Sequence, residues 1–407
     1  MQVVFGIDVS KAKSNVCELI GEARNEFVIA NDRLGFKQLL CELSVFKEHP
    51  QIIFEATGVY SRRLQAMLEA YGYDYVIINP LKAKKEMDLG LRHNKTDRGD
   101  AYLLALIQKL YHHPVNRKQD QVYEQLGSMS RFYDQLTSDI VMIKNRLHQA
   151  LQSTFPEIED LFSSAKGENY WKIVKQYPHC NLAISDDKQS ISGWLESLKG
   201  VSRKRARKTA ERLVELAKKS YPAADEDSIE TEQACYYAQR LLELDKKRSQ
   251  LLDKMIKLAR TLPNNDLENL ESIPGFAQTT AVRVLAELGD VRRFANPGKI
   301  NAFIGIDPGR YQSGEKDARL AISKHGNAIA RKLLYRAIGQ IDNASKTNPC
   351  HIADYYENKK RSLQTKGFKK IAIASVSRLI RTIYALIVND QKYDYGVTKQ
   401  NQKRLLQ

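Results

Sequence analysis

The 407-residue sequence has few cysteines and no spacing that would tie them together. The five cysteines lie scattered along the chain and none forms a CxxC pair, which argues against a zinc site or a disulfide framework. We see no apolar run of membrane-spanning length, and the start "MQVVFGIDVS" lacks the basic and apolar regions of a secretion signal. We therefore expect a folded protein in a reduced, cytoplasmic setting.

Acidic residues are too few to balance the basic ones, because 48 Asp and Glu face 64 Lys and Arg, a net charge of +16. Such an excess suggests a polyanionic partner, most often nucleic acid, whereas solubility alone needs a smaller charge. Residues 1–115 are nearly neutral, with 15 basic and 14 acidic residues, while 264–407 hold 24 and 13. The positive charge is therefore mainly C-terminal.

Residues 1–115 predict an α/β domain. Three short strand-like runs come first, at 3–10, 14–20 and 26–30. Their connections are short, so neighbouring strands should pair antiparallel. Helix-like and strand-like runs then alternate, at 34–46, 51–57, 59–71, 74–79, 80–89 and from about 96. This order is the layout of an RNase H-like (RuvC-like) domain, although other α/β units share it.

Residues 116–263 predict a coiled-coil region with a helical insert at 163–223. Apolar residues recur in alternating three- and four-residue steps over more than three heptads, in both 118–162 and 229–262. The two helices can pair within one chain or across a dimer. The insert contains the basic stretch "SRKRARKTAER" at 202–212, which fits a solvated helix face and a nucleic-acid contact equally well.

Residues 264–407 predict an all-α C-terminal domain. The segment "LESIPGFAQTTAVRVLAEL" at 270–288 resembles a helix-hairpin-helix element, whose turn amides and following helix N-terminus can hold a phosphate. An ordinary helical hairpin fits the same pattern.

Four carboxylates stand out in the first 115 residues. Asp8 lies inside the first strand, Glu55 ends the fourth, and Asp97 and Asp100 share one face of the first turn of a helix. An RNase H-like sheet would bring all four together, and such crowding of like charges is relieved by divalent cations, Mg²⁺ or Mn²⁺. The helix dipole by itself also favours acids in a first turn, but Asp inside a strand and Glu after apolar residues are unfavourable without a role.

Several motifs together resemble one known family. "GIDVSK", "FEATGVY", "NKTDRGDA", "IPG", "FIGIDPGRYQSG" and "ISKHGN" occur in the order found in the DEDD transposases of the IS one-ten family, which are related to the Piv and MooV DNA invertases. The resemblance covers essentially the whole chain. It implies a RuvC-like nuclease domain, a central coiled coil and a C-terminal transposase domain with a nucleophilic serine.

By motif match, the resemblance makes Asp8, Glu55, Asp97 and Asp100 a catalytic, metal-binding tetrad. The family motif often reads Ser-Ser-Gly after a tyrosine; here glutamine takes the first place, so the nucleophile falls on Ser313. The neighbouring Tyr311 is a rival nucleophile, as in tyrosine recombinases. A set of basic residues near Ser313 is expected as a group to contact nucleic acid: Arg310, Lys316, Arg319, Lys324, His325, Arg331 and Lys332.

The resemblance also implies partners that no residue pattern reveals. These are donor and target DNA, a non-coding guide (bridge) RNA from the element that pairs with both, and a homo-oligomer, dimer or tetramer. It implies a prokaryotic, nucleoid-associated protein.

Three other interpretations remain open. A RuvC-like hydrolytic endonuclease or junction resolvase needs the acids but not Ser313. A non-catalytic nucleic-acid-binding protein needs the basic C-terminal part but not the acids. An actin-like kinase or ATPase shares the first "GID" strand, but it needs a repeated second half with glycine-rich phosphate loops, and no such repeat follows residue 115.

Overall fold

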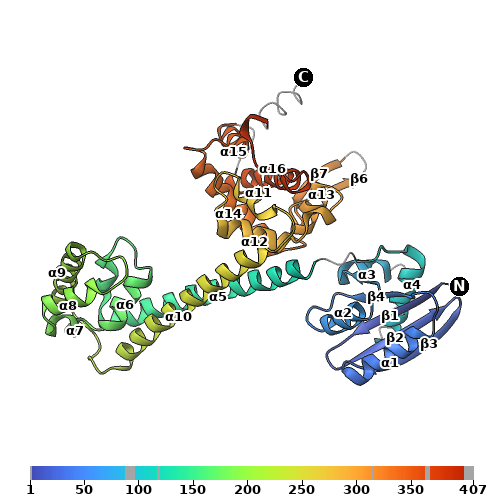
Figure 1. The fold of residues 1–407 in the computed structure, drawn as a ribbon, viewed down its shortest axis with the longest axis horizontal. Coiled ribbons are helices and arrows are strands. Elements are labelled where there is room, and N and C mark those ends of the chain that lie inside the picture. The colour runs from blue at the N-terminus through green and yellow to red at the C-terminus, as the bar shows by residue number, and fades with distance from the viewer. Residues whose placement is uncertain (1, 88–96, 117–119, 314–315, 363–366, 398–407) are drawn as a thin grey trace. The chain divides into compact units, whose positions relative to one another are not determined.

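The computed structural model describes residues 2–87, 97–116, 120–313, 316–362 and 367–397 (Figure 1). The side chains of residues 81, 87, 97–98, 310–313 and 316–320 fall outside this description. The chain divides into two compact units, Met1–Lys118 and Gln119–Gln407. The predicted division into three domains remains a prediction.

The first unit is built on a five-stranded sheet in the order β3-β2-β1-β4-β5. Its strands are β1 (Val3–Val9), β2 (Lys13–Ile20), β3 (Ala23–Ala30), β4 (Gln51–Glu55) and β5 (Tyr75–Ile78). The first three strands pair antiparallel, and β4 and β5 run parallel to β1. The predicted mixed α/β unit is confirmed.

Helices cover both faces of this sheet. They are α1 (Arg33–Ser44), α2 (Ser61–Ala70), α3 (Pro80–Met87) and α4 (Asp97–Tyr111). The side chains of Phe5 and Ile7 pack with residues of α1 and α2. Val4 packs on the opposite face with residues of α3 and α4. Alternation along β1 therefore separates two apolar layers, as expected for a strand buried on both sides.

The second unit contains two long helices, α5 (Gln121–Thr154) and α10 (Ile229–Ala259). They run antiparallel along each other: the Ala223 N–H, shortly before α10, donates to the Ser153 carbonyl at the end of α5 at 2.8 Å. Many of the residues at the predicted three- and four-residue steps are buried, including Leu136 and Ile140 of α5 and Leu241 and Leu244 of α10. The pairing occurs within one chain, so this apolar seam does not by itself require a dimer; the coiled coil remains a prediction.

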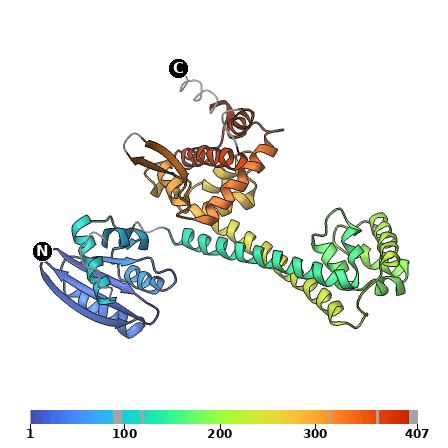
Figure 2. The ribbon, with the colours of Figure 1, turned by 180° about the vertical axis from the view of Figure 1, so that it is seen from behind.

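The insert between these helices is helical, as predicted, and lies at one end of the pair (Figure 2). Its elements are the 3₁₀ helix η1 (Pro156–Leu161), α6 (Glu168–Gln176), α7 (Cys180–Ser185), α8 (Lys188–Glu196) and α9 (Arg203–Lys219).

The C-terminal part is mostly helical but not all-α, which corrects the prediction. Its helices are α11 (Asp266–Glu271), α12 (Gln278–Leu288), η2 (Val291–Arg293), α13 (Pro297–Ile304), α14 (Ala328–Ala344), α15 (His351–Arg361) and α16 (Phe368–Val388). Between α13 and α14 the strands β6 (Pro308–Ser313) and β7 (Lys316–Ile322) form an antiparallel hairpin. A Ser-Gly turn motif between two strand-forming runs is ordinary hairpin chemistry.

The segment "IPGF" connects α11 to α12. Gly275 has φ +85°, and a Cβ atom there would lie 2.6 Å from the Gln340 carbonyl oxygen of α14. The connection is thus packed against α14, and Ile273 and Phe276 beside it are buried. A helix-hairpin-helix role for this segment remains a prediction.

Helix α16 corrects the expectation about apolar runs. Within the described residues it is one helix whose length and composition would suffice to cross a membrane. Half of its apolar window is buried inside the fold, and α16 packs on α11, α14 and α15. Its apolar character is therefore explained by its place in the core.

Candidate active site

Asp8 is positioned by alternation along β1. Phe5 and Ile7 face α1 and α2, while Val4 faces α3 and α4. Asp8 therefore belongs to the face that α4 covers, near the carboxyl end of the strand, and it is half-buried.

Glu55 occupies the corresponding place on the neighbouring strand. The parallel register pairs Ile7 with Phe54, so the next residues of the two strands, Asp8 and Glu55, come side by side. Ile53 packs with α3 and α4, which assigns Glu55 to that same face two residues later. Two carboxylates thus end adjacent parallel strands.

Helix α4 runs antiparallel to β1 and β4. Near its C-terminal end the Gln108 amide donates to Gln51 at the start of β4 at 3.1 Å. In its first half it lies directly on Gly6, where a Cβ atom would come within 2.1 Å of the Ala101 carbonyl oxygen. Since the C-terminal end of α4 meets the beginning of β4, its N-terminus lies at the edge where β1 and β4 end.

This N-terminus carries the remaining two acids of the predicted tetrad. Asp100 directly precedes Ala101 and is half-buried. Asp97 opens the helix one turn earlier, and its side chain lies outside the described part. The fold therefore brings the backbone positions of all four acids to one edge of the sheet.

The donor set fits a hard divalent cation, because carboxylate oxygens are the ligands that Mg²⁺ and Mn²⁺ prefer. Across the described side chains, no cluster of three or more His, Cys, Asp or Glu is close enough to hold a metal ion. The Asp97 side chain lies outside the described part of the structure.

The predicted nucleophile lies at the end of β6. Ser313 pairs with Lys316 in the last described register of the hairpin, and the side chains of Arg310, Ser313, Lys316 and Arg319 fall outside the description. Ser313 is thus the last residue of β6.

Two loops interlock at the base of this hairpin. Gly305 has φ +70°, and a Cβ atom there would lie 2.4 Å from the His325 carbonyl oxygen. Gly326 has φ +131°, and a Cβ atom there would lie 2.2 Å from the Phe303 carbonyl oxygen. The motifs "FIGIDPG" and "SKHGN" therefore hold each other, and with them the two strands of the hairpin.

Three polar side chains that sequence reasoning did not single out complete this base. The Ser323 hydroxyl donates to Asp307 at 2.6 Å. Asn327 accepts from the first amides of α14 and donates to the Glu287 carboxylate at 2.7 Å. Asn before an apolar helical run is an N-cap signal that would have identified Asn327, whereas nothing local marks the Asp307–Ser323 pair.

The described basic residues near the hairpin differ in whether their side chains are exposed to solvent or already bound within the fold. Lys324 and His325 are exposed. Arg331 donates to the Ile304 carbonyl at 2.7 Å. Lys332 contacts Asp134 of α5 at 2.7 Å. Two of the predicted nucleic-acid contacts therefore already have partners within the fold.

Asp134 receives a second cation, Arg283 of α12, at 3.2 Å. Burial raises the pKa of this carboxyl, but hydrogen bonds and charge from Lys332 and Arg283 outweigh burial and bring the pKa below its usual value. The cluster ties α12 and α14 to α5, and so anchors the helices around the hairpin.

Two segments of the chain match family models. Residues 5–156 match the DEDD transposase model of IS110 type, and residues 267–357 match the model described as "Transposase IS116/IS110/IS902 family". The chain belongs to the IS110 family of transposases. The first match implies an RNase H-like fold for the sheet domain and is consistent with a need for a divalent metal.

Individual relatives agree with this family. The transposase of insertion element IS1111A from Coxiella burnetii is 28% identical over 166 residues, which are 40% of this chain and 43% of that protein. The IS116 protein of Streptomyces clavuligerus is 22% identical over 88% of both chains. The pilin gene-inverting protein of Moraxella bovis is 20% identical over 96% of this transposase and 97% of its own length.

Proposed function

We propose that this transposase cleaves and rejoins DNA at the ends of an insertion element through a covalent bond to Ser313. The Ser313 hydroxyl loses its proton as its oxygen attacks a backbone phosphorus and a new P–O bond forms. The bond to the departing sugar oxygen breaks, and that oxygen takes up a proton, so that protons and bonds balance. Because the number of phosphoester bonds is unchanged, a free DNA hydroxyl can later reverse the step on a new strand without an external energy source.

Asp8, Glu55, Asp97 and Asp100 would hold Mg²⁺ or Mn²⁺. When bound, such an ion polarises the scissile phosphate and lowers the pKa of an attacking hydroxyl. A free serine hydroxyl is a weak nucleophile, so Ser313 depends on activation of this kind. The exposed cations beside the hairpin, Lys324 and His325, would hold neighbouring phosphates.

One observation carries this proposal: the close contact of Gly6 with Ala101 sets the N-terminus of α4 at the edge where β1 and β4 end. The helix dipole accounts for acids in the first turn of α4 but not for acids in the two strands. Asp8 lies inside a strand that is otherwise apolar, and Glu55 follows three buried apolar residues of the neighbouring strand on the same face.

We also propose the finer features that the family suggests. A non-coding RNA of the element would pair with donor and target DNA, so that base pairing selects the sequence and the protein contacts backbones. The active form would be a dimer or tetramer. Since the apolar seam of α5 and α10 is used within the chain, assembly would use another surface.

The test is an adduct assay with purified protein, the element's non-coding RNA, Mg²⁺ and labelled donor and target DNA. A denaturing gel should show a protein–DNA adduct for the wild type and none for Ser313→Ala or Asp8→Asn. Omitting the metal should abolish the adduct as well. Tyr311→Phe should keep it, which separates Ser313 from the rival nucleophile.

The second candidate function is hydrolytic cleavage by the four acids with water. It predicts free cleaved ends without an adduct, and cleavage that survives Ser313→Ala. That result would refute the serine assignment while leaving the metal-dependent acids in place.

A further inference from the structure

The helical insert lies outside both segments that match family models. Residues 163–223 contain 13 Lys and Arg against six Asp and Glu, a net charge of +7. The whole region 116–263 has 25 against 21, so the long helices beside the insert are slightly acidic. The basic residues of this region are therefore concentrated in the insert.

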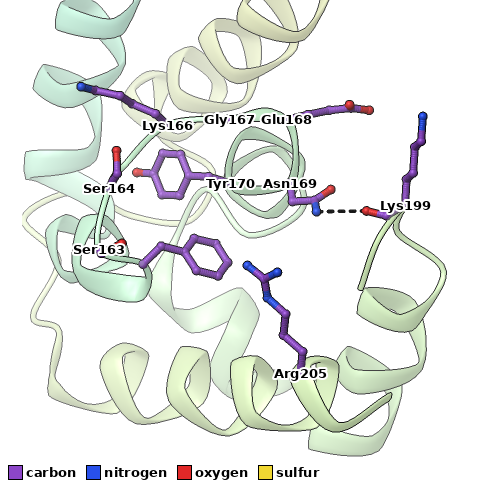
Figure 3. A pocket seen from close by; sticks show the side chains of 10 residues that line it. Ser163, Ser164, Lys166, Gly167, Glu168, Asn169, Tyr170, Lys199 and Arg205 are labelled. Carbon is purple, nitrogen blue, oxygen red and sulfur yellow. Dashed lines mark hydrogen bonds between the residues drawn. The ribbon is translucent and has the colours of Figure 1, made fainter. Parts of the chain in front are cut away.

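A pocket of about 430 Å³ opens where the loop before α6 meets the start of α9 (Figure 3). Lys166, Lys199 and Arg205 line it, and all three are exposed. In Figure 3, Arg205 extends from α9 toward the opposite loop. The lining has one acid, Glu168, which pairs with Lys172 along α6 at 2.6 Å. The lining is therefore positive overall.

The N-terminus of α6 opens onto this pocket. The residue before it, Gly167, has φ +102° and no side chain to cap the helix. The first amides of this nine-residue helix therefore have no capping side chain, and they carry the positive end of the helix dipole. Backbone amides in this arrangement bind phosphate groups.

A buried hydroxyl supplies an independent indication of a ligand. Tyr170 lines the pocket and is 2% exposed, and its hydroxyl has no hydrogen-bond partner among the described atoms. Figure 3 shows this hydroxyl directed toward the Ser164 side of the pocket. Burial and the nearby Glu159 raise the pKa of Tyr170, so the hydroxyl stays a donor. Leaving such a donor unpaired is unfavourable, and an acceptor in the pocket would supply the missing hydrogen bond.

We infer that this pocket binds a backbone phosphate of a nucleic acid. Arg205, Lys199 and Lys166 neutralise the phosphate, and the α6 amides with the Tyr170 hydroxyl donate to its oxygens. Lys204 and Lys208 are exposed one turn apart on α9 and extend the positive surface to the adjoining backbone. The contacts are to phosphate and read no base, so DNA and RNA are both candidate sources.

The inference goes beyond the chemistry of Ser313 and does not depend on it. Binding through the insert requires neither cleavage nor an adduct. A failure of the adduct assay and a failure of binding at this pocket are therefore separate results.

The test measures binding of the full-length transposase to a labelled DNA duplex and to a labelled structured RNA over a series of salt concentrations. The pocket variant is Lys166→Gln, Lys199→Gln and Arg205→Gln combined. The control combines Lys175→Gln, Lys188→Gln and Lys218→Gln, which remove the same charge at the far ends of α6, α8 and α9.

We expect the pocket variant to bind at least one of the two nucleic acids about tenfold more weakly than the control variant. The slope of log affinity against log salt should become shallower by about 0.7–0.9, because the pocket holds one phosphate and each phosphate contact contributes about that much. The nucleic acid that shows the loss identifies the source of the phosphate. Equal affinity and slope for the two variants, with both nucleic acids, would overturn the inference.

Tyr170→Phe provides a second measurement that keeps the packing of the ring. It removes a neutral donor, so affinity should fall about three- to tenfold while the salt slope stays at the wild-type value. Unchanged affinity would remove Tyr170 from the site. An unchanged melting temperature would show that the fold is intact in this variant.

Discussion

Close backbone contacts support both groups of residues proposed for chemistry, one group in each unit. In the first unit Gly6 of β1 lies under Ala101 of α4 and brings the acids to one edge. In the second, Gly305 and Gly326 interlock two loops and hold the hairpin that carries Ser313. Both contacts leave no room for a Cβ atom.

The two contacts differ in what glycine contributes. Gly6 lies in a regular strand and is needed only because the helix comes so close. Gly326 has φ +131° and is needed for its conformation as well as for space. The hairpin base should therefore tolerate substitution less than the sheet edge does, and two substitutions test this difference.

The largest effect is expected for Gly326→Ala. A new methyl group must displace the Phe303 carbonyl while the backbone holds a conformation that L residues rarely adopt, so the free energy of unfolding should fall by about 4 kcal/mol. Chemical denaturation and hydrogen exchange in β6 and β7 measure the loss. Gly339→Ala is the matched control, since an exposed helical glycine with no atom near its added Cβ should lose nothing.

A smaller loss of unfolding free energy is expected for Gly6→Ala, because this substitution adds a steric clash but no backbone strain. Moving α4 off the sheet should lower the free energy of unfolding by about 2–3 kcal/mol. It should also shift the acids apart, so DNA cleavage should be impaired even under conditions in which the variant is folded. Denaturation and the adduct assay test both parts. Gly72→Ala, with open space but φ +76°, should cost only about 1 kcal/mol and leave cleavage normal. If Gly6→Ala cleaves DNA normally, the close contact does not position the acids.

The smallest loss of stability is expected from acidification, and its source is His351 in the second unit. Burial is the main cause that lowers the pKa of His351 to about 4; Arg378 of α16 lowers it further and Asp354 of α15 opposes. The ring also hydrogen-bonds to Tyr393 and to Thr382 of α16.

The unfolded chain binds the proton below pH 6.5 while the folded chain does not, so stability falls as pH decreases toward 4. Between pH 7 and pH 5 we expect a loss of about 2 kcal/mol. Denaturation at pH 7, 6 and 5 measures this loss. His351→Gln should show a flatter pH profile, and an equally steep profile in that variant would exclude His351 as its source.

Much of the first unit was predictable because its strands and helices follow local patterns. Strand alternation assigned Asp8 to one face, and the strand order brought Glu55 beside it, as the register shows. The β6–β7 hairpin was missed, because "GRYQSGEK" contains charged residues and a turn motif rather than a clear alternation. The binding partners of Arg331 and Lys332 could not be predicted either, since Ile304 and Asp134 are remote from them in the sequence.

The sequence by itself determined the element types of the first unit, the long apolar helices, the family and the order of its motifs, since periodicity and short motifs are local properties. Only the tertiary structure decided that α5 and α10 pair within the chain, that glycines interlock at the hairpin base, and which cations remain exposed. These outcomes depend on contacts between residues far apart in the chain, where packing geometry and competing partners decide.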